Sequence, residues 1–173
     1  MEPLREAGSH RASLPSLKEG WVVSASWACL TLDLVYSEKL AARLGLSPPL
    51  PPWVTSRRVR IGEKVGLAAD EVLFYLYRDE ALLEAPPFVL RHLSGVASMR
   101  HLLGVPCDPK LWWVDRNPVH VSPTPDALWK RGEGLVAVEY DAGYPKPHVL
   151  EKIAGLVRGH DGVVWGVPDA VRL

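Results

Sequence analysis

The sequence predicts an α+β fold, in which an N-terminal winged helix-turn-helix domain precedes a small α/β domain with a mixed sheet. Three observations predict this fold: apolar residues at helical spacing before the first proline cluster, an aromatic and β-branched run after it, and a helix-strand alternation after Pro86-Pro87. The predicted organisation is a mobile arm over residues 1–20, the winged helix over 21–86 and the α/β domain over 87–173.

The helix-turn-helix prediction begins with apolar residues at three- and four-residue spacings between residues 21 and 46. Ser37 is suited to cap a short second helix over residues 38–44, and Gly45 is suited to end it. A further helix is expected over residues 53–62. The run EVLFYLYR at residues 71–78 then predicts a strand, the wing.

A basic run lies in the expected helix over 53–62 and just after it. It consists of Arg57, Arg58, Arg60 and Lys64. Such side chains can neutralise phosphates beside a helix in the major groove of double-stranded DNA, and their neighbours can contact bases. The alternative is a solvated helix face, which is how most charge runs are used.

The C-terminal half predicts a regular order of elements. A helix is expected over 88–103 with Gly104 as its terminator, then extended segments at 110–115, 119–121 and 126–130, and a tight turn at 131–134. A clear strand follows at 135–141, then a helix over 145–158 and a short buried strand over 162–167. This order predicts an α/β layer structure with a mixed sheet.

Four residues in this half carry candidate chemistry. Glu139 and Asp141 fall on one face of the strand at 135–141, and a hairpin through Gly132 and Gly134 would bring Asp126 toward them. Lys152 lies on the next helix, within reach of the sheet. Three carboxylates and an amine at one strand end suit Mg²⁺-assisted phosphodiester hydrolysis, with the carboxylates as metal ligands. The alternative is a set of solvated acids with Lys152 in a surface ion pair.

Composition excludes several classes of protein. The chain has 173 residues with 20 basic and 20 acidic side chains, so a nucleic-acid partner would have to be met by a local patch. The sequence has no run of 18 apolar residues and no secretory signal, so we expect no membrane partner. Two cysteines, Cys29 and Cys107, are too few for a disulfide framework, so we expect a cytoplasmic location. The spacing of the six His predicts no zinc site, although the Arg91-His92 and Arg100-His101 pairs are candidates for a second phosphate-binding face.

The C-terminal residues carry a family resemblance. Pro125-Asp126-Ala127, the strand end Glu139-Tyr140-Asp141 with Gly143 after it, and the helix pair Glu151-Lys152 resemble the replication-relaxation family of plasmid and phage proteins. The segment LRHLSGVASMRHLLG at 90–104 resembles the Arg-His helix that joins the two halves in that family. The resemblance implies an N-terminal winged helix and a C-terminal nuclease-like half.

The same pattern is similar to the PD-(D/E)xK nuclease superfamily, whose sites use two acids and a lysine. Here Asp141 stands at the position of the lysine, so the resemblance implies either that Lys152 serves as a migrated lysine or that the site is inactive. An added acid beside the scissile phosphate would oppose catalysis unless it has its own metal ion.

These observations support three hypotheses. The first is a DNA-binding protein of a plasmid or phage, acting in replication, transfer or transcription control, with a degenerate nuclease-like domain. The second is an Mg²⁺-dependent DNA endonuclease, and the third is a module that binds a host or phage protein. A homodimer is compatible with each.

Overall fold

The computed structural model describes residues 26–61, 70–116, 124–141 and 146–167. The predicted arm at 1–20, Lys64, and the predicted extension at 119–121 lie outside these residues. Within them the chain is a mixed α+β protein with two sheets, one of which is mixed. The α+β class and the mixed sheet of the C-terminal half are confirmed.

The first sheet is antiparallel and has the strand order β1-β3-β2. Its strands are β1 (Val35–Ser37), β2 (Val54–Ile61) and β3 (Asp70–Tyr77). Four short helical segments accompany it: η1 (Trp27–Cys29), α1 (Leu30–Asp33), α2 (Glu38–Arg43) and α3 (Glu80–Glu84). The Ser37 side chain accepts a hydrogen bond from the Leu40 amide, and Gly45 has a φ of +70°, so the predicted cap and terminator of α2 are both confirmed.

The helix predicted over 53–62 is wrong, because residues 54–61 form the strand β2. The segment VTSRRVRI is rich in β-branched residues, and Val54 and Val59 are buried where it pairs with β3 along its whole length. Residues 44–53 form turns that include a cis Pro48-Pro49 bond, so no helix stands between α2 and β2. The helical pattern at 21–46 is interrupted as well: Leu34 has a φ of 70°, and the strand β1 follows it.

The second sheet has the order β4-β5-β6-β7. Its elements are β4 (Trp112–Val114), β5 (Ala127–Arg131), β6 (Gly134–Tyr140), α5 (Lys146–Gly159) and β7 (Gly162–Gly166). The first three strands are antiparallel, and β7 runs parallel to β6 because α5 carries the chain back across the sheet. Gly132, with a φ of 63°, makes the tight turn between β5 and β6.

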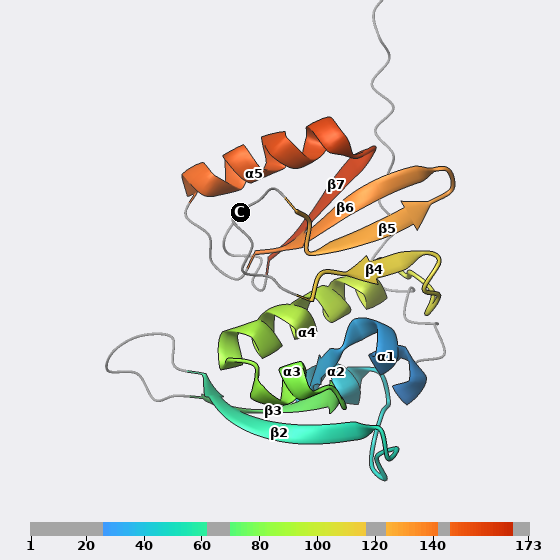
Figure 1. The fold of residues 1–173 in the computed structure, drawn as a ribbon, viewed down its shortest axis with the longest axis vertical. Helices are drawn as coiled ribbons and strands as arrows, with labels where there is room; N and C mark the ends of the chain where they lie inside the picture. The colour runs from blue at the N-terminus through green and yellow to red at the C-terminus, as the bar shows by residue number, and fades with distance from the viewer. Residues whose placement is uncertain (1–25, 62–69, 117–123, 142–145, 168–173) are drawn as a thin grey trace, which may run out of the picture.

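The long helix α4 (Pro87–Leu102) lies between the two sheets (Figure 1). Its Leu90 and Leu93 pack in one core with Phe74 of β3, whereas Val96 packs in another with Trp112 of β4. A helix that is apolar on most sides is buried on most sides. From one end to the other in Figure 1, the layers are α5, the mixed sheet, α4 and the antiparallel sheet.

Candidate active site

Two carboxylates meet where β5 begins and β6 ends. Ala127 pairs with Val138 in the sheet, so Asp126, one residue earlier, lies opposite Glu139. The Asp126 amide donates a hydrogen bond to Glu139 Oε1 at 3.2 Å, and the Tyr140 amide donates to Asp126 Oδ2 at 2.7 Å. The turn at Gly132 sets this register, and the register brings together two residues that are 13 positions apart.

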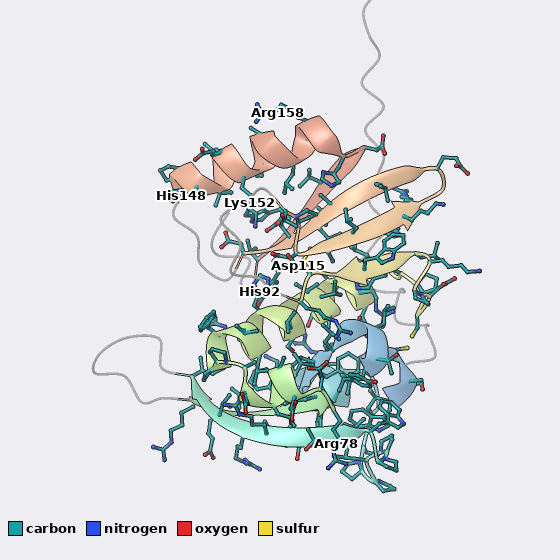
Figure 2. The ribbon with its side chains drawn as sticks, in the orientation of Figure 1. Arg78, His92, Asp115, His148, Lys152 and Arg158 are labelled. Atoms are coloured by element: carbon teal, nitrogen blue, oxygen red, sulfur yellow. The ribbon has the colours of Figure 1, made fainter. Side chains whose placement is uncertain are left out.

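Lys152 reaches the same point from α5. Its Nζ lies 2.7 Å from Glu139 Oε2 and 3.9 Å from Asp126 Oδ1. Figure 2 shows Lys152 extending from α5 toward the sheet. The structure therefore brings together three of the four residues that sequence reasoning selected: Asp126, Glu139 and Lys152.

Asp141, the fourth candidate, is hydrogen-bonded to residues of β7. Its amide donates to the Gly166 carbonyl at 2.8 Å, and its Oδ2 accepts from Trp165 Nε1 at 3.4 Å. The side chain is buried at 9% exposure. The position that carries lysine in the nuclease pattern therefore holds an acid that is hydrogen-bonded to the adjacent strand.

Two further residues approach the site that sequence reasoning did not select. His92 of α4 places Nε2 3.2 Å from Asp126 Oδ1, and its ring meets the Tyr140 ring edge-on. Asp115 directly follows β4, and its backbone amide donates a hydrogen bond to the Asp126 carbonyl at 2.8 Å. Figure 2 labels both residues. No signal in the sequence links residues 34 positions apart such as His92 and Asp126; only the packing of α4 on the sheet does.

The two carboxyls are in different electrostatic states. Burial and the neighbouring Asp126 charge raise the pKa of Glu139 to about 8, although Lys152 opposes this shift. Burial also acts to raise the pKa of Asp126, but His92, the Tyr140 amide and Lys152 together outweigh it and hold this pKa below its ordinary value. The site therefore pairs a carboxyl whose pKa is lowered with a carboxyl whose pKa is raised, which is a frequent arrangement in active sites.

The donor atoms suit a cation that is shared with a substrate. Among the described residues no group of three His, Cys, Asp or Glu side chains could hold a metal ion. Asp126 and Glu139 nevertheless offer carboxylate oxygens on adjacent strands. Mg²⁺ is usually bound by one or two carboxylates together with waters and substrate phosphates, so this pair fits Mg²⁺ in that mode.

Three of the four residues predicted to bind DNA lie on the strand β2 instead of a helix. Arg57 donates to the Leu83 and Ala85 carbonyls at 2.9 and 2.6 Å, so it ties β2 to the end of α3. Arg58 is exposed, with Glu71 at 3.9 Å, and Arg60 is exposed opposite Glu71 in the strand register. Lys64 lies outside the described residues.

Arg100 and His101 do not form a phosphate-binding face, because both are buried in the core. Arg100 donates from Nε and Nη2 to the two carboxylate oxygens of Asp33, each at 2.6 Å, and from Nη1 to the Val105 carbonyl at 2.7 Å. Tyr36 donates to the same carboxylate at 2.6 Å. This cluster joins α1 to α4 and is structural.

Within the described ranges, no helix has the length and apolar character needed to cross a bilayer. Comparison of the chain with protein-family models, with curated proteins and with solved structures finds no match.

Proposed function

We propose that this protein is a Mg²⁺-dependent nuclease that hydrolyses phosphodiester bonds of DNA. One observation carries the proposal: Lys152 Nζ from the crossover helix lies 2.7 Å from the Glu139 carboxylate and 3.9 Å from the Asp126 carboxylate of the adjacent strand. The element order α4-β4-β5-β6-α5-β7, with Pro125-Asp126 at the head of β5 and Glu139 in β6, agrees with the nuclease pattern that the sequence resembles. A role in plasmid or phage replication is a further proposal, and it rests only on the resemblance to the replication-relaxation family.

The roles follow from position and charge. Asp126 and Glu139 would hold a divalent cation, which supplies Lewis-acid polarisation of the phosphate and a more acidic bound water. Lys152 carries a positive charge beside both carboxylates and is suited to stabilise charge that develops on a phosphate oxygen. Asp141 is hydrogen-bonded to β7, and Lys152 supplies a positive charge beside Glu139.

A second candidate is a DNA-binding protein whose nuclease-like site is inactive. The contact that favours it is the 2.7 Å approach of Lys152 Nζ to Glu139 Oε2, since a lysine that neutralises the carboxylate competes with a cation. Its winged-helix component has weaker support. The order β1-β3-β2 provides a wing-like sheet, but β2 stands where the DNA-reading helix was expected.

The test is cleavage of supercoiled plasmid and of linear duplex and single-stranded DNA, in Mg²⁺, in Mn²⁺ and in EDTA. Wild type is compared with Glu139→Gln and Lys152→Met, and with Glu133→Gln as the matched control. Glu133 is an exposed acid at the opposite end of the β5-β6 hairpin. All variants are first shown to unfold cooperatively.

Metal-dependent cleavage that persists in Glu133→Gln and disappears in Glu139→Gln supports the nuclease. Binding of DNA by wild type without cleavage in either metal ion contradicts it and supports the second candidate. Absence of both binding and cleavage contradicts both candidates and leaves the protein-interaction hypothesis.

A further inference from the structure

An open shelf lies on the same face of the mixed sheet as the candidate active site. Its residues are Trp113 of β4, Leu128 and Lys130 of β5, and Leu135 of β6. Trp113 pairs with Leu128 and Lys130 pairs with Leu135, and side chains two positions apart in a strand share a face, so all four point to one side of the sheet. The same alternation in β6 puts Glu139 on this side, so the shelf adjoins the candidate active site.

The described helices leave this shelf uncovered. α5 packs over β7, which lies at the opposite edge of the sheet from β4 (Figure 1). Along one row of paired side chains the exposure rises away from α5: Ala137 of β6 is fully buried, Leu128 is half-buried and Trp113 is 42% exposed. Lys130 and Leu135, in the next row, are exposed as well. The outer half of this face is therefore open to a partner.

Trp113 differs from the other described tryptophans in its surroundings. Trp112 is fully buried in a core, and the Arg131 guanidinium lies 5.4 Å from the ring centroid of Trp129. A neighbouring ring or a side-chain hydrogen bond accompanies the remaining three, which are Trp27, Trp53 and Trp165. Trp113 is exposed, and within the described ranges no ring or cation lies against its indole. An exposed indole with nothing stacked on it is suited to bind a planar ligand.

The positions of Trp113 and Lys130 favour a single strand of nucleic acid as that ligand. Asp126 comes two residues before Leu128, the partner of Trp113, so the indole lies one row of side chains, roughly 7 Å, from the row of the candidate active site. Every nucleobase has a π face that can stack on an indole, whereas base pairing and stacking in a duplex hide those faces. Lys130 makes no ion pair with any described residue, so its amine can bind a phosphate of the same strand.

We propose that Trp113 stacks on a base of single-stranded DNA and that Lys130 binds a phosphate of the same strand, next to the scissile bond. This inference rests on the proposed function, because it names unpaired DNA as the substrate of that same site. The leucines of the shelf would suit a protein partner equally well. The basic side chain and the continuity with a phosphodiester site favour nucleic acid.

The first test compares two single-stranded probes by fluorescence anisotropy, in EDTA so that no cleavage occurs. One probe is a short fluorescein-labelled thymidine strand, and the other is an abasic strand of the same length, which has the phosphates without the bases. Wild type is compared with Trp113→Ala and Trp113→Phe. The matched control is Phe88→Ala, which removes an aromatic side chain of 61% exposure from α4, outside the shelf. All variants are first shown to unfold cooperatively.

Trp113→Ala should bind the thymidine strand about 5- to 150-fold more weakly than wild type, which is the effect of one base stacked on an aromatic ring. Its affinity for the abasic strand should not change, because that strand has no base to stack. Trp113→Phe should recover most of the lost affinity, and Phe88→Ala should bind both strands as wild type does.

The second test addresses Lys130 through the dependence of affinity on salt. Lys130→Gln should lower the slope of log affinity against log salt by about 0.7 for the thymidine strand, because one phosphate contact to a single strand is lost. The matched control is Lys39→Gln, which removes an exposed lysine of α2 and should keep the wild-type slope.

Several results would overturn the assignment of the shelf. One is wild-type affinity of Trp113→Ala for the thymidine strand, and another is an equal loss in Phe88→Ala. An equal loss toward the abasic strand also overturns it, because the indole would then not act through a base. An unchanged slope in Lys130→Gln, or an equal fall in Lys39→Gln, removes Lys130 from the contact. Failure of wild type to bind either strand at about 50 mM salt overturns the assignment and favours a protein partner.

The shelf and the nuclease fail separately. Trp113-dependent binding of single strands without metal-dependent cleavage keeps the shelf and refutes the nuclease. Metal-dependent cleavage of single-stranded DNA with an unchanged KM in Trp113→Ala keeps the nuclease and refutes the shelf.

Discussion

Arg100→Met is expected to be the most damaging single change outside the candidate active site. The guanidinium is fully buried and makes a two-point contact with Asp33, which is itself fully buried. After the substitution, Asp33 keeps contacts to Tyr36 and His101, but its strongest counter-charge is lost. A buried carboxylate without a full counter-charge is costly in a medium of low polarisability.

The magnitude follows from that geometry. Loss of one partner of a buried ion pair costs about 3–5 kcal/mol, a large part of the roughly 5–15 kcal/mol that stabilises a typical domain. The matched control is Arg58→Met, because Arg58 makes an exposed pair with Glu71 at 3.9 Å and should lose only about 0–1 kcal/mol. The double variant Arg100→Met/Asp33→Leu should cost less than the sum of its two single changes by about 0.5–3 kcal/mol.

The pH dependence of the free energy of unfolding provides a second test of the Asp33–Arg100 ion pair. In wild type, burial acts to raise the pKa of Asp33, but His101, Arg100 and Tyr36 outweigh it and hold this pKa below 3.8. Asp33 therefore contributes stability above pH 3.8 that is lost as the pH falls through its folded pKa. Without Arg100 the effect of burial should prevail and raise the folded pKa, so the deficit of the variant relative to wild type should shrink between about pH 7 and about pH 5.

The assay is urea unfolding followed by tryptophan fluorescence at both pH values, for wild type, both single variants, the control and the double variant. The reasoning is refuted if Arg100→Met loses no more free energy than Arg58→Met. It is also refuted if the deficit of the Arg100 variant grows on acidification.

Three other predictions follow from contacts in the described structure. Gly95→Ala should lose about 1–3 kcal/mol in urea unfolding, because its Cβ would overlap the Tyr140 ring, whereas Gly159→Ala, with open space at its Cβ, should lose nothing. Arg57→Met should lose about 1.5–3 kcal/mol with its two hydrogen bonds to carbonyls at the C-terminal end of α3, yet leave the dependence of DNA affinity on salt unchanged. Glu139→Gln should abolish metal-dependent cleavage without lowering the free energy of unfolding in EDTA, because burial disfavours the charged form of this carboxyl.

Each of these three predictions would be contradicted by a specific result. Equal unfolding curves for the Gly95 and Gly159 variants would mean that the Tyr140 ring is not held against α4. A lower salt slope for Arg57→Met would restore Arg57 as a phosphate ligand. A large loss of stability in Glu139→Gln would indicate that the contact with Lys152 is structural.

The candidate site was predictable from sequence because it depends on local geometry. The tight turn at Gly132 fixes the hairpin register, and once the register is fixed Asp126 must lie near Glu139. Lys152 followed from the helix periodicity after the strand. The helix α4 was equally clear, since its apolar residues are dense and Gly104, with a φ of 66°, ends it.

The predictions that failed, and the contacts that the sequence did not predict, have physical causes as well. The segment that forms β2 has two adjacent arginines, so the alternation typical of a strand is broken, and its pairing with β3 overrides the local pattern. The burial of Arg100 depends on Asp33, 67 residues away, and the approach of His92 to Asp126 depends on the packing of a helix on a sheet. Neither contact can be predicted from a short segment of the sequence.

The central place of α4 has a mechanical consequence. One helix holds His92 against Asp126 on one side and Ser94 against the Ser37 amide on the other. A shift of α4 that loosens its contact with β1 therefore also changes the contact of His92 with Asp126. Because one helix makes both contacts, the two halves of the described structure are expected to unfold together in one transition.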